Sequence, residues 1–305
     1  MRTIVECVPN FSEGEDRNKI ESILQALLAG PDVHVLGTQM DADHNRTVVT
    51  FVGTRETIGE AALRAIGRAA ELIDLNEHHG VHPRMGATDV VPFVPIKGVD
   101  LSDCVEIASR VAEETWRRFR IPTYLYEAAA RDPRRKNLEY VRRGQFEQLR
   151  EEVRQNPDRR PDFGEADLHP TAGATAVGAR NFLIAYNINL KSSDLSLAKS
   201  IARKIRASDG GLPAVKALGV EVKALGMVQV SMNLTDFPTT PISTVFDAVA
   251  AEAARADIEI ESSEIVGLVP RRAIEGTDIA RLRLRNFSDQ LILENQIEEA
   301  QGNVL

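Results

Sequence analysis

Hydrophobic and polar positions change their spacing along the chain, and these changes predict where strands and helices lie. Segments that alternate with a period of two predict strands, whereas apolar residues three or four positions apart predict helices. The first third of the sequence contains six such elements, in the order strand, helix, strand, strand, helix, strand: 3–8, 12–28, 33–40, 47–52, 58–73 and 89–96. This βαββαβ order is that of a ferredoxin-like unit.

Two local signals refine these elements. Ser12 followed by Glu15 resembles a capping box, which predicts the start of the first helix. The prolines within 89–96 predict a strand that is irregular or at the edge of a sheet, because proline has no N–H to donate to a neighbouring strand.

The βαββαβ order returns in the last part of the chain. Its predicted elements are a strand at 182–190, a helix at 194–206, a strand pair at 215–224 and 227–236, a helix that begins at Thr240-Pro241 and a strand at 258–266. We find no convincing repeat of residues, so the duplication is one of architecture. Beyond Val269 we expect one or two further helices, one of them around 286–300.

The middle of the chain connects the two series. Asp100 is expected to cap a helix, and 122–126 predicts a short strand. The segment 131–160 is dense in charge, which predicts a solvated connection with helices around Leu138 and at 145–155. The following stretch, 156–175, is rich in Pro, Gly, Asp and Thr, as in a linker or a binding loop.

These patterns predict an α+β protein made of two ferredoxin-like (βαββαβ) α/β subdomains, 1–178 and 179–305. Each unit would leave one sheet face to be buried against the other unit or a second chain. We therefore expect the two subdomains to be packed around a ligand cleft.

Composition and charge narrow the class of protein. The chain has 305 residues, a net charge of −8 and two cysteines, Cys7 and Cys104. The charge argues against a nucleic-acid binder, although a few local arginines can still attract a small anion. Two cysteines make no disulfide framework, and we find neither a signal-peptide pattern nor an apolar run long enough to span a membrane. We expect a cytoplasmic, soluble protein.

One loop, 78–89, concentrates the candidate chemistry. It holds three of the six histidines, an arginine, an aspartate and two glycines. Histidine has an ordinary pKa near ~6.5 and is the usual proton shuttle at neutral pH. Pro83 favours an extended backbone at His82, and glycine lets a ligand or another backbone approach closely.

Three interpretations compete for this loop and for the polar loop 41–46. A metal centre would use His and Asp, but no spacing here matches a zincin motif or a helical pair. An acid–base site would use one histidine, with arginines to hold carboxylates. The third interpretation is structural, with surface histidines and a turn closed by an Arg–Asp pair; it fits His78 and His79 better than His82. Glycine-rich nucleotide loops and a serine-hydrolase elbow are absent from the sequence.

Several ordered motifs resemble those of the glutamate formimidoyltransferase (formiminotransferase) family, in its single-function form without the cyclodeaminase domain. They are Cys7-Val8-Pro9-Asn10-Phe11-Ser12-Glu13-Gly14, Asn45-Arg46-Thr47-Val48, His82-Pro83-Arg84-Met85-Gly86, Tyr124-Leu125-Tyr126-Glu127-Ala128-Ala129, Pro161-Asp162-Phe163-Gly164, Gly173-Ala174-Thr175, Gly178-Ala179-Arg180 and Ile188-Asn189-Leu190. The similarity covers essentially the whole chain. It implies two α/β subdomains with a folate site between them.

The resemblance also implies a reaction and its residues. The family transfers a formimino group from N-formimino-L-glutamate to N5 of tetrahydrofolate in histidine degradation, and His82 matches its catalytic histidine. The family's folate-binding segment matches Phe163, Gly164, Glu165, Ala166, Asp167, Leu168, His169, Pro170, Thr171 and Ala172. Residues 165–169 depart from the mammalian-type loop. The chain stops where bifunctional members continue, so any cyclodeaminase is expected to be a separate protein, and dimers are expected.

On this basis we expect roles for further residues. Asn10 would line the pterin side, Asp41 or Asp43 would hold the other ring nitrogen of His82 or stabilise the cationic substrate, and Arg46 and Arg84 would bind substrate carboxylates. No metal and no nucleotide is expected. Two alternatives remain at this point, a folate enzyme that acts on 5-formyltetrahydrofolate and a non-catalytic folate-binding protein.

Overall fold

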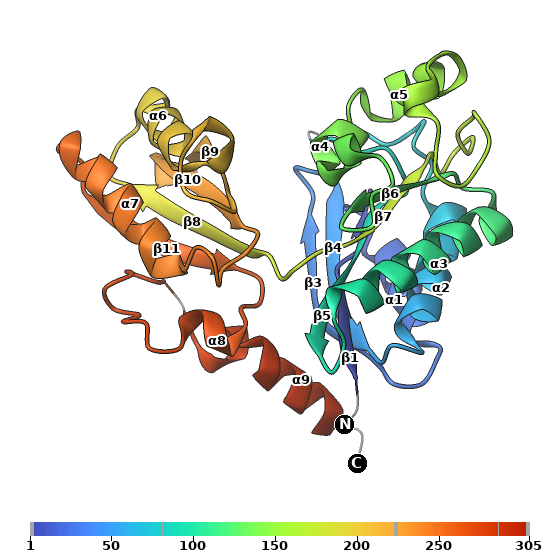
Figure 1. Ribbon diagram of the computed structural model, residues 1–305, viewed down its shortest axis with the longest axis horizontal. Coiled ribbons are helices and arrows are strands. Elements are labelled where there is room, and N and C mark those ends of the chain that lie inside the picture. The colour runs from blue at the N-terminus through green and yellow to red at the C-terminus, as the bar shows by residue number, and fades with distance from the viewer. Residues whose placement is uncertain (1–2, 81, 223–224, 286, 303–305) are drawn as a thin grey trace. The chain divides into compact units, whose positions relative to one another are not determined.

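The chain folds as two α+β subdomains, each with its own β-sheet (Figure 1). A computed structural model describes residues 3–80, 82–222, 225–285 and 287–302. Contacts within the structure divide the chain into unit 1, Met1–Arg180, and unit 2, Asn181–Leu305. Val81 of the histidine loop and the predicted element ends Ala224 and Asn286 lie outside the described residues. The mixed α+β class predicted from the sequence is confirmed. The prediction that the subdomains are packed around a ligand cleft stays a prediction.

Unit 1 begins with the predicted βαββαβ order and continues with two more strands. Its elements are β1 (Ile4–Cys7), β2 (Asn10–Phe11), α1 (Arg17–Leu28), β3 (Val33–Asp41), β4 (Arg46–Gly53), α2 (Ile58–Leu72), β5 (Thr88–Lys97), α3 (Leu101–Phe119), β6 (Thr123–Glu127), the 3-10 turn Pro133–Lys136, α4 (Leu138–Val141), α5 (Gln145–Gln155), the 3-10 turn Pro157–Arg159 and β7 (Thr175–Ala179). β4 pairs with β3 on one side and with β1 and β2 on the other. β1 and β2 also pair with β5, and β7 and β6 follow beyond β5. The helices α1, α2 and α3 lie side by side on one face of this sheet (Figure 1).

The proline-containing strand β5 lies inside the sheet, so the prediction of an edge strand is wrong. It pairs antiparallel with β1 and β2 on one side and parallel with β7 on the other. The prediction of irregularity is confirmed, because the register with β1 shifts between Ile4 and Val5, next to Pro95. A shift in register lets the strand tolerate a residue without an N–H.

The predicted capping box of Ser12 and Glu15 is also wrong. The first helix starts later, with Asp16 as its N-cap, whose carboxylate accepts a hydrogen bond from the amide of Asn18. Residues 10 and 11 are instead held as β2 between β4 and β5, and the hydroxyl of Ser12 donates to the carbonyl of Gly86 at 2.8 Å. Ser12 therefore ties the N-terminal strand to the histidine loop.

The charge-dense segment 131–160 is part of unit 1, and its prediction as a solvated connection is only partly right, because half of its residues are exposed but some, arginines among them, are buried. The helices predicted around Leu138 and at 145–155 are present as α4 and α5. Arg159 is only 2% exposed, and its guanidinium donates to the carbonyls of Tyr140, Val141 and Arg143. Because arginine carries five N–H donors, one buried side chain can satisfy several carbonyls at the end of a short helix.

Unit 2 is a four-stranded antiparallel sheet with helices on one face. Its elements are β8 (Ile184–Leu190), α6 (Leu195–Ile205), the 3-10 turn Ala207–Asp209, β9 (Val215–Val222), β10 (Met227–Leu234), α7 (Ile242–Arg255), β11 (Ile260–Val266), α8 (Arg271–Ile274), the 3-10 turn Asp289–Leu291 and α9 (Leu293–Gly302). The strand order is β11-β8-β10-β9. Thr240 is not the N-cap of α7; its hydroxyl donates to the carbonyl of Pro213, and Pro241 takes the cap position without a side-chain bond.

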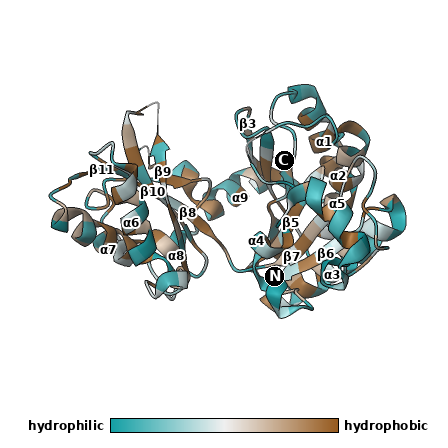
Figure 2. Ribbon diagram, turned by 90° about the horizontal axis from the view of Figure 1, so that it is seen from above, coloured by the Kyte–Doolittle hydropathy of each residue, from teal (hydrophilic) through white to brown (hydrophobic). Residues whose placement is uncertain are grey.

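Apolar residues gather on the strands and on the sheet-facing sides of the helices, whereas polar residues colour the outer surface (Figure 2). No helix in the described ranges is long and apolar enough to cross a membrane. The apolar side chains are therefore buried in the two cores between sheet and helices, as expected from the helical and strand periodicities.

Candidate functional site

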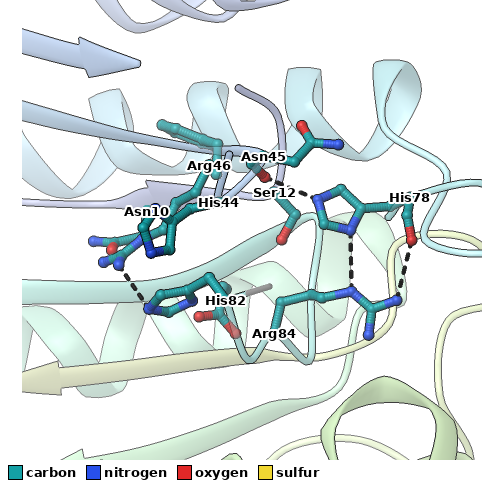
Figure 3. Close-up of a pocket in the computed structure, with 10 residues that line it drawn as sticks. Asn10, Ser12, His44, Asn45, Arg46, His78, His82 and Arg84 are labelled. Carbon is teal, nitrogen blue, oxygen red and sulfur yellow. Dashed lines mark hydrogen bonds between the residues drawn. The ribbon is translucent and has the colours of Figure 1, made fainter. Parts of the chain in front are cut away.

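A small polar pocket lies in unit 1, where the loops 78–87 and 41–46 meet the strand β2 (Figure 3). Its walls combine cations, imidazoles and amides: Asn10, Phe11, Ser12, His44, Asn45, Arg46, His78, His82, Arg84 and Asp89. Four residues predicted for the site, Asn10, Arg46, His82 and Arg84, are brought together here. The side chain of Asn10 donates to the carbonyl of Val8, and its Oδ1 is buried without a partner.

Asn45 joins three loops beneath the pocket. Its Oδ1 accepts from the amide of Gly14 at 2.8 Å, its Nδ2 donates to the carbonyl of His79 at 2.9 Å, and its own carbonyl accepts from His78 Nε2 at 2.9 Å. The backbone φ of Asn45 is +44°, a region that asparagine tolerates better than most residues. Asn45 opens the motif Asn45-Arg46-Thr47-Val48, from which no role for its side chain is predicted.

Two glycines of this region are required by close backbone approach. A Cβ on Gly80 would lie 2.5 Å from the carbonyl oxygen of His44, and one on Gly86 would lie 2.1 Å from that of Ala174. Both distances are far below van der Waals contact. The prediction that glycines of the histidine loop let another backbone approach closely is confirmed.

Replacing Asn45 tests how much this junction stabilises the folded protein. Asn45→Ala removes two side-chain hydrogen bonds and places alanine at positive φ, so we expect a loss of about 2–4 kcal/mol in the free energy of unfolding. Urea unfolding measures the loss. The matched control, Asn45→Asp, keeps the acceptor for Gly14 and the tolerance of positive φ but loses the donor to His79, so its loss should be smaller. Equal losses in both variants would contradict this account.

His82 is hydrogen-bonded through Nε2 to Arg46, at 2.7 Å from Nη1 (Figure 3). A guanidinium can only donate, so Nε2 carries the lone pair and the imidazole is neutral, with its proton on Nδ1. Burial, together with the positive charges of Arg46 and Arg142, lowers the pKa of His82 to about 4. A hydrogen bond to the backbone of Pro83 and the charge of Asp89 act in the opposite direction.

Arg142 and Asp89 form an ion pair beside the pocket that the sequence analysis missed. Asp89 is 3% exposed; it accepts from the amide of Met85 at 2.9 Å and from Arg142 Nη2 at 2.5 Å. Arg142 follows α4, inside the segment predicted to be solvated, and one sequence alone gave no signal for its place here. The pair therefore places a second guanidinium near His82, together with the carboxylate of Asp89.

Arg84 is buried in the pocket wall and already has an acidic partner. Its Nη1 and Nη2 donate to Glu147 at 2.9 and 2.7 Å, and its Nε donates to His78 Nδ1 at 3.1 Å. His78 in turn donates from Nε2 to the carbonyl of Asn45, so it links two loops, but it is buried and not the surface histidine that the structural interpretation predicts. His79 is exposed. Arg84 would have to leave Glu147 to bind a substrate carboxylate, whereas Arg46 forms no ion pair with any carboxylate in the described part of the chain.

The two aspartates predicted beside His82 are placed at the rim instead. Asp41 accepts from the ring of His44 at 2.8 Å and from the His44 amide at 2.9 Å, and these bonds lower the pKa of its carboxyl. The His44 ring lies 6.3 Å from the His82 ring, centroid to centroid. Asp43 is exposed on the same loop. Asp41 thus orients His44 in this structure and does not bind His82.

The predicted folate segment, 163–172, is an ordered loop of unit 1 and does not line this pocket. His169 Nδ1 accepts from the amides of Thr171 and Ala172, which folds the loop back on itself. The other residues of the segment have different surroundings. The backbone of Phe163 pairs with Thr123, Gly164 has φ of +134°, and Asp167 binds Arg154. Leu168 is buried, Ala166 is half-buried and Glu165 is exposed, and the carbonyl of Pro170 accepts from Asn76 and Arg150.

Although its side chains lie outside the pocket, the segment is attached to the histidine loop. The Ala87 amide donates to the carbonyl of Ala172, and Gly173 pairs with Gly86 in an antiparallel bridge. Gly173 has φ of +66°, and a Cβ there would lie 2.2 Å from the Met85 carbonyl oxygen. The two predicted functional segments are therefore neighbours along one short backbone ladder.

Metal ligation finds no geometric support among the residues that the structure describes. No group of three or more His, Cys, Asp or Glu side chains there is arranged to hold an ion. The buried cysteines Cys7 and Cys104 lie away from the pocket lining, and burial raises the pKa of both thiols above the usual range.

Comparison with known proteins gives matches over nearly the whole chain. The model of the formiminotransferase domain, N-terminal subdomain, matches residues 4–180, and that of the formiminotransferase domain matches residues 185–297. A glutamate formimidoyltransferase of Streptococcus pyogenes serotype M1 is 43% identical over 298 residues, which cover 97% of this chain and 99% of that protein.

Two further relatives extend the comparison. A glutamate formimidoyltransferase of Thermoplasma acidophilum is 44% identical over 302 residues, covering 98% of each chain. A formimidoyltransferase-cyclodeaminase of Mus musculus is 40% identical over 279 residues, which cover 90% of this chain and 51% of that protein.

Proposed function

The chain belongs to the formiminotransferase family, and we propose that it is a transferase that moves the formimino group of N-formimino-L-glutamate to N5 of tetrahydrofolate. The observation that supports this best is sequence identity of 43% and 44% to two glutamate formimidoyltransferases over almost their full lengths. Tetrahydrofolate is a co-substrate in this proposal, and the products are 5-formiminotetrahydrofolate and L-glutamate.

The proposed chemistry needs one group that can accept and return a proton. N5 of tetrahydrofolate attacks the formimino carbon, and the new N–C bond gives a tetrahedral intermediate. His82 takes the proton from N5 and passes it to the glutamate nitrogen, so that the old C–N bond breaks with a neutral amine as leaving group. The neutral imidazole is the protonation state that this first step requires, although its Nε2 accepts from Arg46 in this structure.

Arginine side chains supply the complement to an acidic donor. Arg46 lines the pocket, and no carboxylate among the described residues lies within ion-pair distance of it. A guanidinium binds a carboxylate through two parallel hydrogen bonds, so Arg46 is our candidate for a carboxylate of formiminoglutamate. Asn10, with its unpartnered Oδ1, and the segment 163–172 are our candidates for contacts with the folate.

The proposal includes three further expectations, about the fold of each unit, a homodimer and a separate cyclodeaminase. The βαββαβ order of both units and the strand order β11-β8-β10-β9 support the description of each as ferredoxin-like. A homodimer and a separate cyclodeaminase stay predictions.

A donor assay tests the activity directly. The protein is mixed with tetrahydrofolate and either formiminoglutamate or formylglutamate, and 5-substituted folate is followed by absorbance, with and without a chelator. We expect turnover with formiminoglutamate, at least about tenfold faster than with the formyl donor, and no effect of the chelator. Faster reaction with formylglutamate would favour a 5-formyltetrahydrofolate enzyme, and folate binding without turnover of either donor would favour a binding protein.

A further inference from the structure

We propose that Arg46 acts as a substrate-responsive lock on His82: it occupies the lone pair of Nε2 in the free protein, and the carboxylate of an acidic substrate draws it away. This inference rests on the proposed function and adds a step to it, because the base becomes available only when the substrate has bound. The starting observation is the 2.7 Å hydrogen bond from Arg46 Nη1 to His82 Nε2.

The bond to His82 leaves a conflict in the free protein. The nitrogen that should accept a proton from N5 is already used as an acceptor, so His82 cannot act as a base in this arrangement. Its pKa of about 4 would also make it a weak base at neutral pH. Productive chemistry therefore requires Arg46 to move or to be neutralised.

The guanidinium of Arg46 has few hydrogen-bond and ion-pair partners in the described structure. Its Nε is buried without an acceptor, and no carboxylate among the described residues forms an ion pair with it, whereas Arg84 has Glu147 and Arg142 has Asp89. Burial and the nearby charge of Arg142 lower the pKa of Arg46 to about 10. An imidazole is a neutral acceptor, so an incoming carboxylate would compete with it strongly for the guanidinium.

The charges around His82 determine how its pKa changes when Arg46 leaves Nε2 for a substrate carboxylate. Arg46 on β4 and Arg142 after α4 are positive, Asp89 on β5 is negative, and the His44–Asp41 pair lies at the rim. A bound carboxylate adds one negative charge and removes the Arg46 donor from Nε2. Both changes favour protonation of His82, so substrate binding should raise its pKa toward the working pH.

The test follows His82 by nitrogen-15 NMR in the full-length protein labelled in its histidine rings. The probe is glutarate, a dicarboxylate without a transferable group, and the uncharged glutaramide is its control. We expect glutarate to raise the pKa of His82 by about one unit or more and to change the shift of Nε2, while glutaramide does neither. In Arg46→Met the pKa of His82 should be raised without any ligand and should respond little to glutarate.

Two further variants separate the lock from simple charge effects. Arg142→Met removes a neighbouring positive charge but leaves the hydrogen bond, so the Nε2 signal should still respond to glutarate. Arg46→Lys keeps the charge if the methionine variant fails to fold, and its shorter ammonium should show a weakened lock. An unchanged His82 signal in saturating glutarate, no binding of glutarate, or identical titration of His82 in wild type and the Arg46 variants would overturn the proposal.

Kinetics give an independent outcome. The acid limb of kcat/KM reports the free protein and that of kcat reports the substrate complex, so the lock predicts a higher apparent pKa in kcat than in kcat/KM. Coincident limbs would contradict it. Because the NMR experiment needs no turnover, a glutarate response without transferase activity would overturn only the proposed function, and activity without a glutarate response would overturn only the lock.

Discussion

Replacing His82 by alanine is expected to lower kcat by about 10²- to 10⁴-fold while tetrahydrofolate still binds. This range is the typical contribution of one positioned acid–base group. His82 faces the pocket and has a neutral imidazole with its Nε2 lone pair directed at Arg46, so its loss removes the proton carrier without opening the hydrophobic core. Steady-state turnover with formiminoglutamate and calorimetric binding of tetrahydrofolate measure the two quantities separately.

Two matched variants make the His82 experiment specific. His82→Gln keeps a side chain that can accept from Arg46 but cannot carry a proton, so we expect a loss of the same order as in the alanine variant. His79→Ala removes an exposed imidazole from the same loop and should retain nearly full activity. Turnover within about tenfold of wild type in both His82 variants would remove His82 from the chemistry.

Much of the fold could be predicted because the periodic spacing of apolar residues indicates where each helix and strand lies. α5 was predicted at its observed bounds, since Phe146, Leu149 and Val153 recur at helical spacing and are buried. The strand β7, Thr175–Ala179, was not predicted, because it is buried in the sheet between β5 and β6 and its small residues show no alternation. A strand that is covered on both faces has no polar face from which to recognise its period.

Of the site, the residues of the two loops could be predicted from the sequence, but their partners from other segments could not. His82, Arg46 and Arg84 could be predicted to lie together, because a histidine-rich loop and a polar turn flank adjacent elements and match a family motif. The partners of these residues could not be predicted. Glu147 and Arg142 come from a segment about 60 positions later in the sequence, and only tertiary packing sets them against Arg84 and Asp89.

Electrostatics explain why the charged segment misled the prediction. Charge-rich stretches are usually solvated, because a buried charge without a partner is costly. Here the arginines are paired: Arg135 binds Asp162 at 2.6 Å, Arg142 binds Asp89, and Arg159 binds Glu152 as well as backbone carbonyls. Asp89 lies on the distant strand β5, Glu152 lies on α5 of the same segment, and Asp162 follows it, so folding supplies a partner for each buried arginine that residue composition does not reveal.

A large pH effect on stability is expected from Glu6, a buried carboxyl on β1. Burial raises its pKa from 4.5 to about 7, against the opposing charge of Arg180. The folded state therefore binds more protons than the unfolded state between these two values, and this contribution to stability is fully present below about pH 4.5 and is lost as the pH rises through 7. The loss amounts to about 3 kcal/mol in the free energy of unfolding.

Glu6→Gln isolates this effect because glutamine has the same shape and does not titrate. Between about pH 5 and pH 8, the urea midpoint of the wild type should fall more steeply than that of Glu6→Gln, and the variant should be the more stable protein at the upper pH. Glu21→Gln removes an exposed carboxylate from α1 and serves as the control for a change in net charge. Parallel pH profiles for wild type and Glu6→Gln would show that the Glu6 carboxyl is ionised at no cost in the folded protein, through compensation by Arg180.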